Sequence, residues 1–289
     1  MELLQTLSVS DVQQKIRELC RNWKPAYEQV PLLESLHRVT AKPVRSSHQV
    51  PQFDRSTVDG YAVCARDTFG ASDSIPAMLQ QSGVVAMGTD PQFSLQSGQC
   101  AYIPTGGMLP EGSDAVVMIE YVEELDQETI LVQQSVSPGN NVLKAGEDLQ
   151  ENEIIFNAGH RIRPQDLGLL AGMGYHQITV YSPLKAAVIS TGDELIQPGQ
   201  PLIPGKIIDM NSFSLAGALS EDGLNVVFTD VVEDNLEMLQ TAIRRAMNLA
   251  QIVLISGGSS MGTHDITKEA INSIGSPGVV VHGMAVKPG

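Results

Sequence analysis

Residues 185–195 read Lys-Ala-Ala-Val-Ile-Ser-Thr-Gly-Asp-Glu-Leu. The run up to Ser190 is short and apolar, as in a strand buried on both faces, and a glycine turn follows it. From this stretch onward, strand-like and helix-like segments alternate. The expected strands are residues 185–190, 225–230, 251–256 and 279–281, and the expected helices are residues 212–221, 235–250 and 265–273. This alternation predicts a parallel, doubly wound α/β sheet.

Ligands of such sheets bind beyond the carboxyl ends of the strands, and this rule selects two loops. The first, residues 190–195, carries adjacent carboxylates at Asp193 and Glu194 after a glycine. Paired carboxylates can hold a cation or orient a hydroxyl group. A cluster of acidic residues that simply favours a helix start is the structural alternative.

The second loop, residues 256–265, reads Ser-Gly-Gly-Ser-Ser-Met-Gly-Thr-His-Asp. Glycines and exposed amides ahead of a helix form a nest that binds anions. The spacing matches neither the Walker A loop nor the dinucleotide-binding fingerprint. A tight connection that merely needs glycine is the alternative here.

Another segment dense in reactive side chains is residues 50–63, Val-Pro-Gln-Phe-Asp-Arg-Ser-Thr-Val-Asp-Gly-Tyr-Ala-Val. It places Asp54, Ser56 and Asp59 in one short loop, which suits a ligand, a metal ion or an interface. A surface loop that caps its own backbone is the alternative. The following region predicts a β-rich domain, because short β-branched runs alternate with Gly and Pro. These runs are residues 77–79, 99–103, 115–119 and 129–133.

The remaining segments predict a mixed helical and extended part. Residues 8–20 are expected to form an amphipathic helix with Ser10 as its N-cap and with Val12, Ile16 and Leu19 on one stripe. Further helical segments are expected at residues 31–36 and, opened by Pro164, at residues 165–172.

A length of 289 residues suggests two or three domains. The expected division is a linking domain of residues 8–48 and 142–177, an inserted β-rich domain of residues 49–141, and an α/β domain of residues 178–289. A single irregular α+β domain is the alternative.

Composition narrows the classes of function. The formal net charge is −15, from 33 acidic and 18 basic residues, which disfavours nucleic-acid and membrane-surface partners. The three cysteines are widely spaced, so neither a zinc site nor a disulfide framework is expected. No signal-peptide pattern or long apolar run is present, and we expect a cytoplasmic protein.

The motifs together resemble the MoeA-type molybdopterin molybdenumtransferases. The family signature Pro-x-Phe-Asp-x-Ser-x-x-Asp-Gly-Tyr-Ala is met at every fixed position of residues 51–62. Similar blocks follow in the family's order. They are residues 103–117, which start Ile-Pro-Thr-Gly-Gly, residues 190–195, residues 233–235 and residues 256–268. The resemblance therefore spans nearly the whole chain.

The resemblance implies a site assembled from distant segments. Its catalytic residues would be Asp59, Thr105, Glu194, Asp234 and Asp265. Residues that bind the phosphorylated substrate would be Ser256, Gly257, Gly258, Ser260, Gly262, Lys268 and Lys287. Asp59, Glu194 and Asp265 would hold Mg²⁺, because carboxylates beside a phosphate need a cation between them.

The implied activity is transfer of molybdate to adenylylated molybdopterin with release of AMP, giving the molybdenum cofactor. The family also implies a homodimer whose site is shared between protomers, and a molybdopterin adenylyltransferase as the pathway partner. Two alternatives stay open: a non-catalytic scaffold of the same family, and a molybdopterin adenylyltransferase.

The sequence departs from the family pattern in two places. Where some members carry a second lysine, four positions before Lys287, this chain has Gly283 beside His282. Family members also continue beyond the position of Gly289, through the end of the α/β domain and a small C-terminal β domain. We therefore expect a fragment or a curtailed protein, with weakened substrate binding.

Overall fold

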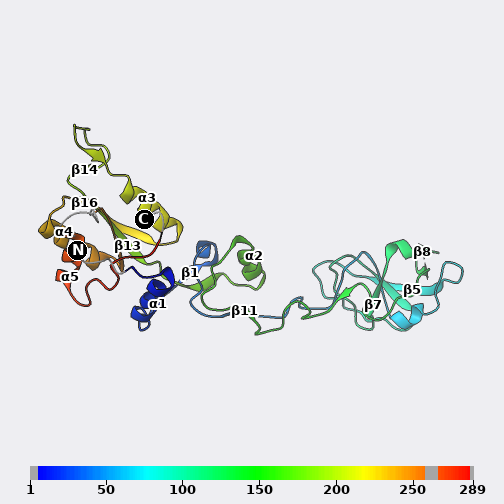
Figure 1. The fold of residues 1–289 in the computed structure, drawn as a ribbon. Helices are drawn as coiled ribbons and strands as arrows, with labels where there is room; N and C mark the ends of the chain where they lie inside the picture. Colours follow the sequence, from blue (N-terminus) through cyan, green and yellow to red (C-terminus); the bar gives the residue numbers. More distant parts are fainter. Residues whose placement is uncertain (1–5, 258–265, 287–289) are drawn as a thin grey trace. The chain divides into compact units, whose positions relative to one another are not determined.

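The computed structural model describes residues 6–257 and 266–286 of the chain. These residues fall into two units, each with its own hydrophobic core (Figure 1). The first unit comprises Met1–Ala41, Arg161–Pro164 and Gln177–Gly289, and the second comprises Lys42–His160 and Gln165–His176. The predicted combination of an α/β part with a β-rich part is confirmed.

A three-stranded parallel sheet forms the centre of the first unit. Its strand order is β16-β13-β17, with bounds Asn225–Val232 for β16, Lys185–Thr191 for β13 and Ile252–Gly257 for β17. Every residue of β13 after Lys185 is buried. Each fully buried Val or Ile side chain stabilises the fold by about 1.5–3 kcal/mol. The apolar run quoted at the outset therefore forms the middle of the sheet.

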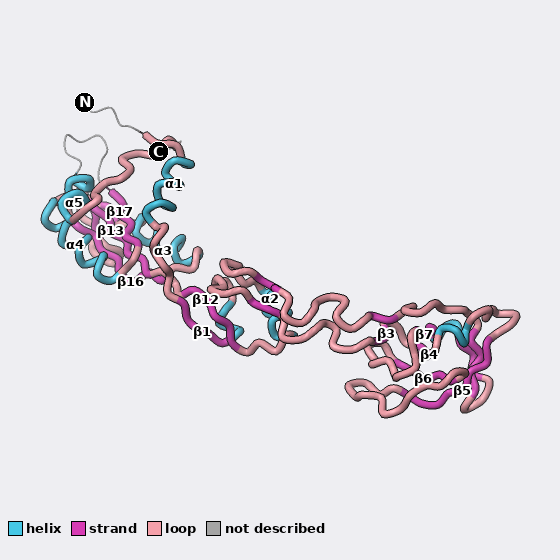
Figure 2. Tube along the Cα trace, turned by 90° about the horizontal axis from the view of Figure 1, so that it is seen from below, coloured by secondary structure: helices cyan, strands magenta, loops and turns pink. Residues whose placement is uncertain are grey.

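Helices cover both faces of this sheet, as doubly wound folds require. Helices α4 (Leu236–Leu249) and α5 (Ile266–Ile274) pack with Ala187 and Ile189 on one face. Helix α3 (Asn211–Glu221) lies on the opposite side (Figure 2). Helix α4 begins where Asn235 accepts hydrogen bonds from the amides of Glu237 and Met238, as an N-cap does.

The last predicted strand, residues 279–281, is wrong, because the structure has no strand among described residues 275–286. The amide of Val279 donates instead to Oδ1 of Asn272 at 2.8 Å, which ties this segment to α5 rather than to the sheet. An apolar run does not become a strand when a side chain takes its amide first.

The N-terminal part of the first unit contains one helix and a two-stranded ladder. The N-cap of helix α1 (Val9–Leu19) lies two residues earlier than predicted, because Ser8, not Ser10, accepts the amide of Asp11. Strand β1 (Tyr27–Pro31) pairs antiparallel with β12 (Gln177–Tyr181). The helix expected at residues 31–36 is a short 3-10 turn, Leu32–Ser35.

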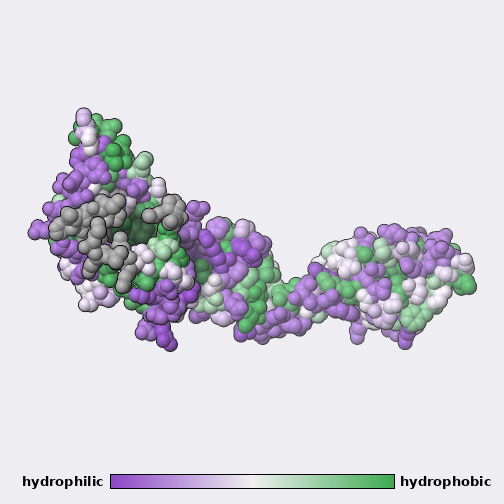
Figure 3. Space-filling model, in the orientation of Figure 1, coloured by the Kyte–Doolittle hydropathy of each residue, from purple (hydrophilic) through white to green (hydrophobic). Residues whose placement is uncertain are grey.

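Two apolar surfaces of the first unit stay uncovered by the described residues. Helix α1 buries none of its residues, and Ile16 and Leu19 of its predicted stripe are 54% and 59% exposed. The segment that carries β14 (Leu195–Ile196) and β15 (Ile207–Ile208) also exposes apolar side chains (Figure 3). Amphipathic surfaces of this kind commonly bind other protein surfaces.

A six-stranded sheet dominates the second unit, with order β7-β4-β6-β5-β9-β8. The strands are β4 (Gly60–Val63), β5 (Ala77–Val84), β6 (Gln99–Ile103), β7 (Ala115–Met118), β8 (Val122–Glu124) and β9 (Thr129–Val132). All pairs are antiparallel except β5 with β6. Strand β4 is fully buried, since Tyr61 and Val63 pack in one apolar cluster and Ala62 in another.

Shorter elements complete the second unit. Strand β2 (Val44–Arg45) pairs with β11 (Ile154–Phe156), and β3 (Arg55–Ser56) pairs with β10 (Val142–Leu143). Helix α2 (Pro164–Gly172) starts at the proline that the sequence indicated. Residues 42–48 and 142–160 lie in the same unit as the six-stranded sheet. The three-part division at residues 48/49, 141/142 and 177/178 stays a prediction. Among described residues, no helix has the length and apolarity needed to cross a membrane.

Replacement of Gly60 by Ala should destabilise the second unit by about 3 kcal/mol. A Cβ atom at this position would lie 1.9 Å from the carbonyl oxygen of Val117, so strand β4 and the edge strand β7 would have to separate. Urea unfolding followed by circular dichroism measures the loss. Gly168→Ala in α2 is the matched control, because nothing lies within 4 Å of its Cβ position. Equal stability of the two variants would contradict the prediction.

Candidate functional site

Backbone hydrogen bonds bring two of the sequence motifs together in the second unit. The amide of Ser56 donates to Gly107 at 3.0 Å, and the amide of Gly106 donates to Ser56 at 2.8 Å. The amide of Leu109 donates to the carbonyl of Asp54 at 2.9 Å. The block at residues 50–63 therefore lies alongside the block at residues 103–112, about fifty positions later in the chain.

Asp59 and Thr105, both predicted site residues, meet at this junction. One carboxylate oxygen of Asp59, Oδ1, accepts the amide of Thr105 at 2.8 Å and its hydroxyl at 3.1 Å. Both residues are exposed. No hydrogen bond to the second oxygen, Oδ2, is present within the described part of the chain. The arrangement fixes the carboxylate and presents its other oxygen to solvent, where a ligand can reach it.

The remaining polar residues of the 50–63 block hold the loop itself. Asp54 accepts hydrogen bonds from Nζ of Lys144 at 2.7 Å and from the amide of Ala145 at 2.8 Å. Ser56 is buried, and its hydroxyl donates to Val58 at 2.5 Å. A loop that caps its own backbone, the alternative, therefore describes Ser56, whereas Asp54 ties the loop to residues 144–145 and Asp59 is left available.

Partners of Asp54 change its pKa. Partial burial raises the pKa, and the hydrogen bond from Lys144, the amide of Ala145 and the charge of Lys144 together outweigh this, so the pKa lies below its ordinary value of 3.8. The carboxylate is stabilised in its charged form and anchors residues 144–145 to the motif.

In the first unit, Glu194 and Asp234 lie at the carboxyl ends of adjacent strands. The hydroxyl of Thr191, the last residue of β13, donates to Asp234 at 2.6 Å, and the amide of Asp234 donates to Asp193 at 3.0 Å. The exposed carboxylate of Glu194 lies over Gly192, 2.9 Å from where a Cβ atom would stand. Asp193 and Glu194 therefore follow β13, and Asp234 follows β16, at the carboxyl edge of the sheet.

The end of β17 contributes Ser256 and Gly257. Gly257 has φ +111°, and a Cβ atom there would lie 2.0 Å from the carbonyl of Thr191, so only glycine fits. Lys268, in the first turn of α5, is partly buried. The predicted site residues Gly258, Ser260, Gly262, Asp265 and Lys287 lie outside the described residues.

Asp209 is a site residue that the sequence analysis did not single out. It is 3% exposed and accepts hydrogen bonds from Ser190 at the end of β13 and from the first residues of α3. An aspartate three positions before an expected helix is a common N-terminal signal, but nothing in the neighbouring sequence indicates the hydrogen bond that Asp209 accepts from β13.

Models of protein families match almost the entire chain. The MoeA N-terminal region, domains I and II, matches residues 7–174, and a "probable molybdopterin binding domain" matches residues 187–289. The chain belongs to the MoeA family.

Similar MoeA-family proteins come from bacteria and archaea. The molybdopterin molybdenumtransferase of Bacillus subtilis is 33% identical over 96% of this chain and 65% of its own length. A Methanocaldococcus jannaschii protein named for molybdopterin biosynthesis is 36% identical over 91% of this chain and 65% of its own. The crystal structure of the molybdopterin biosynthesis MoeA protein from Pyrococcus horikosii matches with a TM-score of 0.82 and 38% identity. The matched region covers 99% of this chain and 70% of the Pyrococcus horikosii chain. The chain thus spans about two thirds of the length of its MoeA relatives.

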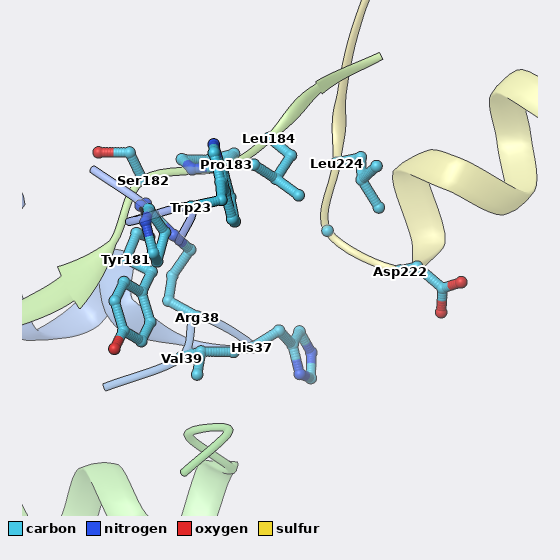
Figure 4. A pocket seen from close by; sticks show the side chains of 12 residues that line it. Trp23, His37, Arg38, Val39, Tyr181, Ser182, Pro183, Leu184, Asp222 and Leu224 are labelled. Atoms are coloured by element: carbon cyan, nitrogen blue, oxygen red, sulfur yellow. Dashed lines mark hydrogen bonds between the residues drawn. The ribbon is translucent and has the colours of Figure 1, made fainter. Parts of the chain in front are cut away.

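One apolar pocket of this MoeA chain lies away from the candidate site. A pocket of about 270 Å³ opens beside the residues that precede β13 and β16, at the amino ends of the strands (Figure 4). Trp23, Tyr181, Leu184 and Leu224 contribute to its walls. None of the predicted site residues lines it. The candidate site is therefore the carboxyl edge of the sheet and not this pocket.

The three predicted magnesium ligands do not occur together among the described residues of one unit. No group of three or more His, Cys, Asp or Glu side chains is placed to hold a metal ion among the residues described. Asp59 belongs to the second unit, Glu194 to the first, and Asp265 lies outside the described residues. The magnesium ligands stay a prediction.

Replacement of Asp54 by Asn should lower the free energy of unfolding at neutral pH by less than about 1 kcal/mol, because the pair with Lys144 is partly exposed. Since the folded pKa lies below 3.8, the contribution of Asp54 is present above pH 3.8 and is lost as the pH falls through the lower folded value. Urea unfolding at neutral and acid pH should show the wild type and the variant converging in acid.

Lys144→Gln is the matched control for this prediction. It removes the same ion pair, so the double variant should be no less stable than Asp54→Asn alone. Full additivity of the two substitutions, or a difference that persists in acid, would show that Asp54 stabilises the loop by other means.

Proposed function

We propose that this chain catalyses molybdenum insertion: it transfers molybdate to adenylylated molybdopterin and releases AMP. Membership of the MoeA family and the matches to molybdopterin molybdenumtransferases support the reaction class. The observation that carries the proposal is the placement of the motif residues. Asp59 is hydrogen-bonded to Thr105 in one unit, and in the other unit Glu194 and Asp234 follow the adjacent strands β13 and β16.

The described residues suit this substrate in distinct ways. The adenylylated substrate carries phosphates, which amides at the end of β17 and the ammonium group of Lys268 can bind. Asp59 is held by Thr105 in one orientation, so its free oxygen can accept a proton or orient a donor on the substrate. Asp234, held by Thr191 and Asp193, can do the same at the sheet edge.

Magnesium is part of the proposal as a counter-ion. Carboxylates at Asp59, Glu194 and Asp265 would repel a phosphorylated substrate, and a bound Mg²⁺ would neutralise them and polarise the phosphate oxygens. The net charge of −15 strengthens this requirement.

A homodimer with a shared site is the proposed active form. The two groups of carboxylates belong to different units, and helix α1 exposes an apolar stripe at Val9, Ile16 and Leu19 that suits burial against a second copy. A chain with this negative charge needs such apolar contacts to associate with itself.

The remaining proposals concern location and pathway. We expect the chain to act in the cytoplasm, where a molybdopterin adenylyltransferase would supply its substrate. The acidic composition supports neither nucleic acid nor membrane as a partner.

Asp59→Asn and Asp234→Asn should each reduce molybdate-dependent AMP release by about a hundredfold or more, because each removes a fixed charge at the reacting groups. Both residues are exposed, so the free energy of unfolding should change by no more than about 0.5 kcal/mol. AMP release is measured with adenylylated molybdopterin, with and without molybdate.

The exposed Asp126, in the turn between β8 and β9, provides a matched control. Asp126→Asn should retain wild-type turnover. Wild-type turnover in either Asp59→Asn or Asp234→Asn would exclude that residue from the site. AMP release that does not depend on molybdate would exclude the proposed reaction.

Mixing two inactive variants, Asp59→Ala and Glu194→Ala, should restore part of the activity. If one protomer supplies Asp59 and the other supplies Glu194, each heterodimer has one site that lacks both residues and one that is intact. Activity is measured after subunit exchange has been verified with differently tagged chains. No recovery would place both residues in the site of a single protomer and remove the shared-site model.

A further inference from the structure

Hydrogen bonds to the buried carboxylate of Asp209 hold the start of helix α3. Asp209, 3% exposed, accepts a hydrogen bond from Ser190 at 3.0 Å and from the amides of Asn211 and Ser212 at 3.1 and 3.2 Å. The hydroxyl of Ser212 also donates to it. A buried carboxylate that receives four donors is well satisfied and fixes the groups that donate to it. The first turn of α3 is thereby held to the end of β13.

Asn211, the first residue of α3, is held from a second direction. Its Nδ2 donates to the hydroxyl of Ser256 at 3.0 Å, which ties the side chain to the last residues of β17. Its backbone amide is held by Asp209. The side-chain amide therefore has a defined position at the carboxyl edge of the sheet, where doubly wound folds bind their ligands.

The side chain of Asn211 has hydrogen-bonding capacity left over. An asparagine amide offers two N–H donors and a carbonyl with two lone pairs, and the bond to Ser256 uses one donor. Within the described residues no hydrogen bond reaches Oδ1 of Asn211, and the residue is exposed. A carbonyl acceptor and an adjacent N–H donor, rigidly held and facing solvent, remain for a ligand.

The carboxylate beside the backbone of Asn211 favours a neutral group at the free acceptor of its side chain. The carboxylate of Asp209 lies within hydrogen-bond distance of its backbone amide. A phosphate near it would meet the charge of Asp209, whereas a neutral heterocycle would not. Among the parts of an adenylylated substrate, the adenine ring is such a heterocycle. It presents an N6 amino donor beside the N7 acceptor, the pair that an asparagine amide matches with its own acceptor and donor.

We propose that Asn211 is a specificity-determining residue that recognises the adenine ring of the substrate, with Asp209 and Ser256 as the residues that position it. This assignment rests on the proposed function, because it takes the adenylylated substrate as the ligand. A purely structural role, in which Asn211 only ties α3 to β17, makes a different prediction. It would give no discrimination between adenine and a base that lacks the N6 donor.

Titration calorimetry with AMP and with IMP tests the assignment directly. In IMP a carbonyl replaces the N6 amino group, so the carbonyl of Asn211 would face an acceptor. The chain should bind AMP about tenfold more tightly than IMP. Asn211→Ala should lose about tenfold in AMP affinity and little in IMP affinity, which removes the preference. Ser256→Ala, which frees the amide, should reduce the preference without abolishing it.

Asn225 provides the matched control, since it is an exposed asparagine at the opposite, amino end of β16. Asn225→Ala should keep the wild-type preference. Equal binding of AMP and IMP by the wild type, or no AMP binding, would overturn the assignment without any variant. A preference retained in Asn211→Ala would also overturn it. An adenine preference without molybdate-dependent AMP release would leave Asn211 in place and exclude only the proposed reaction.

Discussion

Strand β13 is hydrogen-bonded on both edges, to β16 from Lys185 to Thr191 and to β17 from Ala186 to Thr191. Its burial on both faces fixes where the strand ends, and the candidate site of the first unit is built on that end. The hydroxyl of Thr191 holds Asp234, and its carbonyl lies so close to Gly257 that no side chain fits there. One residue earlier, Ser190 holds Asp209 and with it the start of α3.

In the second unit, backbone hydrogen bonds between two distant segments position the carboxylate of Asp59. Residues of the 50–63 block are hydrogen-bonded to residues 106–109, and Asp59 emerges at the end of that contact, directly before buried strand β4. Gly60 follows at once and packs against the backbone of Val117. The rigid backbone on one side of Asp59 and the two hydrogen bonds from Thr105 on the other leave the carboxylate one orientation.

The four aspartates discussed above fall into two groups, according to how many hydrogen-bond donors surround each carboxylate. Asp54 and Asp209 accept enough hydrogen bonds to serve as internal anchors for the segments that they connect. Asp59 and Asp234 are exposed and only partly satisfied. Exposed, partly satisfied carboxylates such as these can bind a ligand without the loss of a hydrogen bond that stabilises the fold. The proposed chemistry is therefore assigned to Asp59 and Asp234.

Local sequence determined the alternation of strands and helices, the β-rich region and the motif blocks, because apolar periodicity and glycine turns act over a few residues. It could not separate Asp54 from Asp59, since only the fold brings Lys144 to one and Thr105 to the other. It misplaced a strand at residues 279–281, where the Asn272 side chain takes the amide. It also passed over Asp209 and Asn211, whose partners Ser190 and Ser256 lie 19 and 45 positions away. Hydrogen bonds across such separations depend on which strand ends meet, and the packing of β13 decides that.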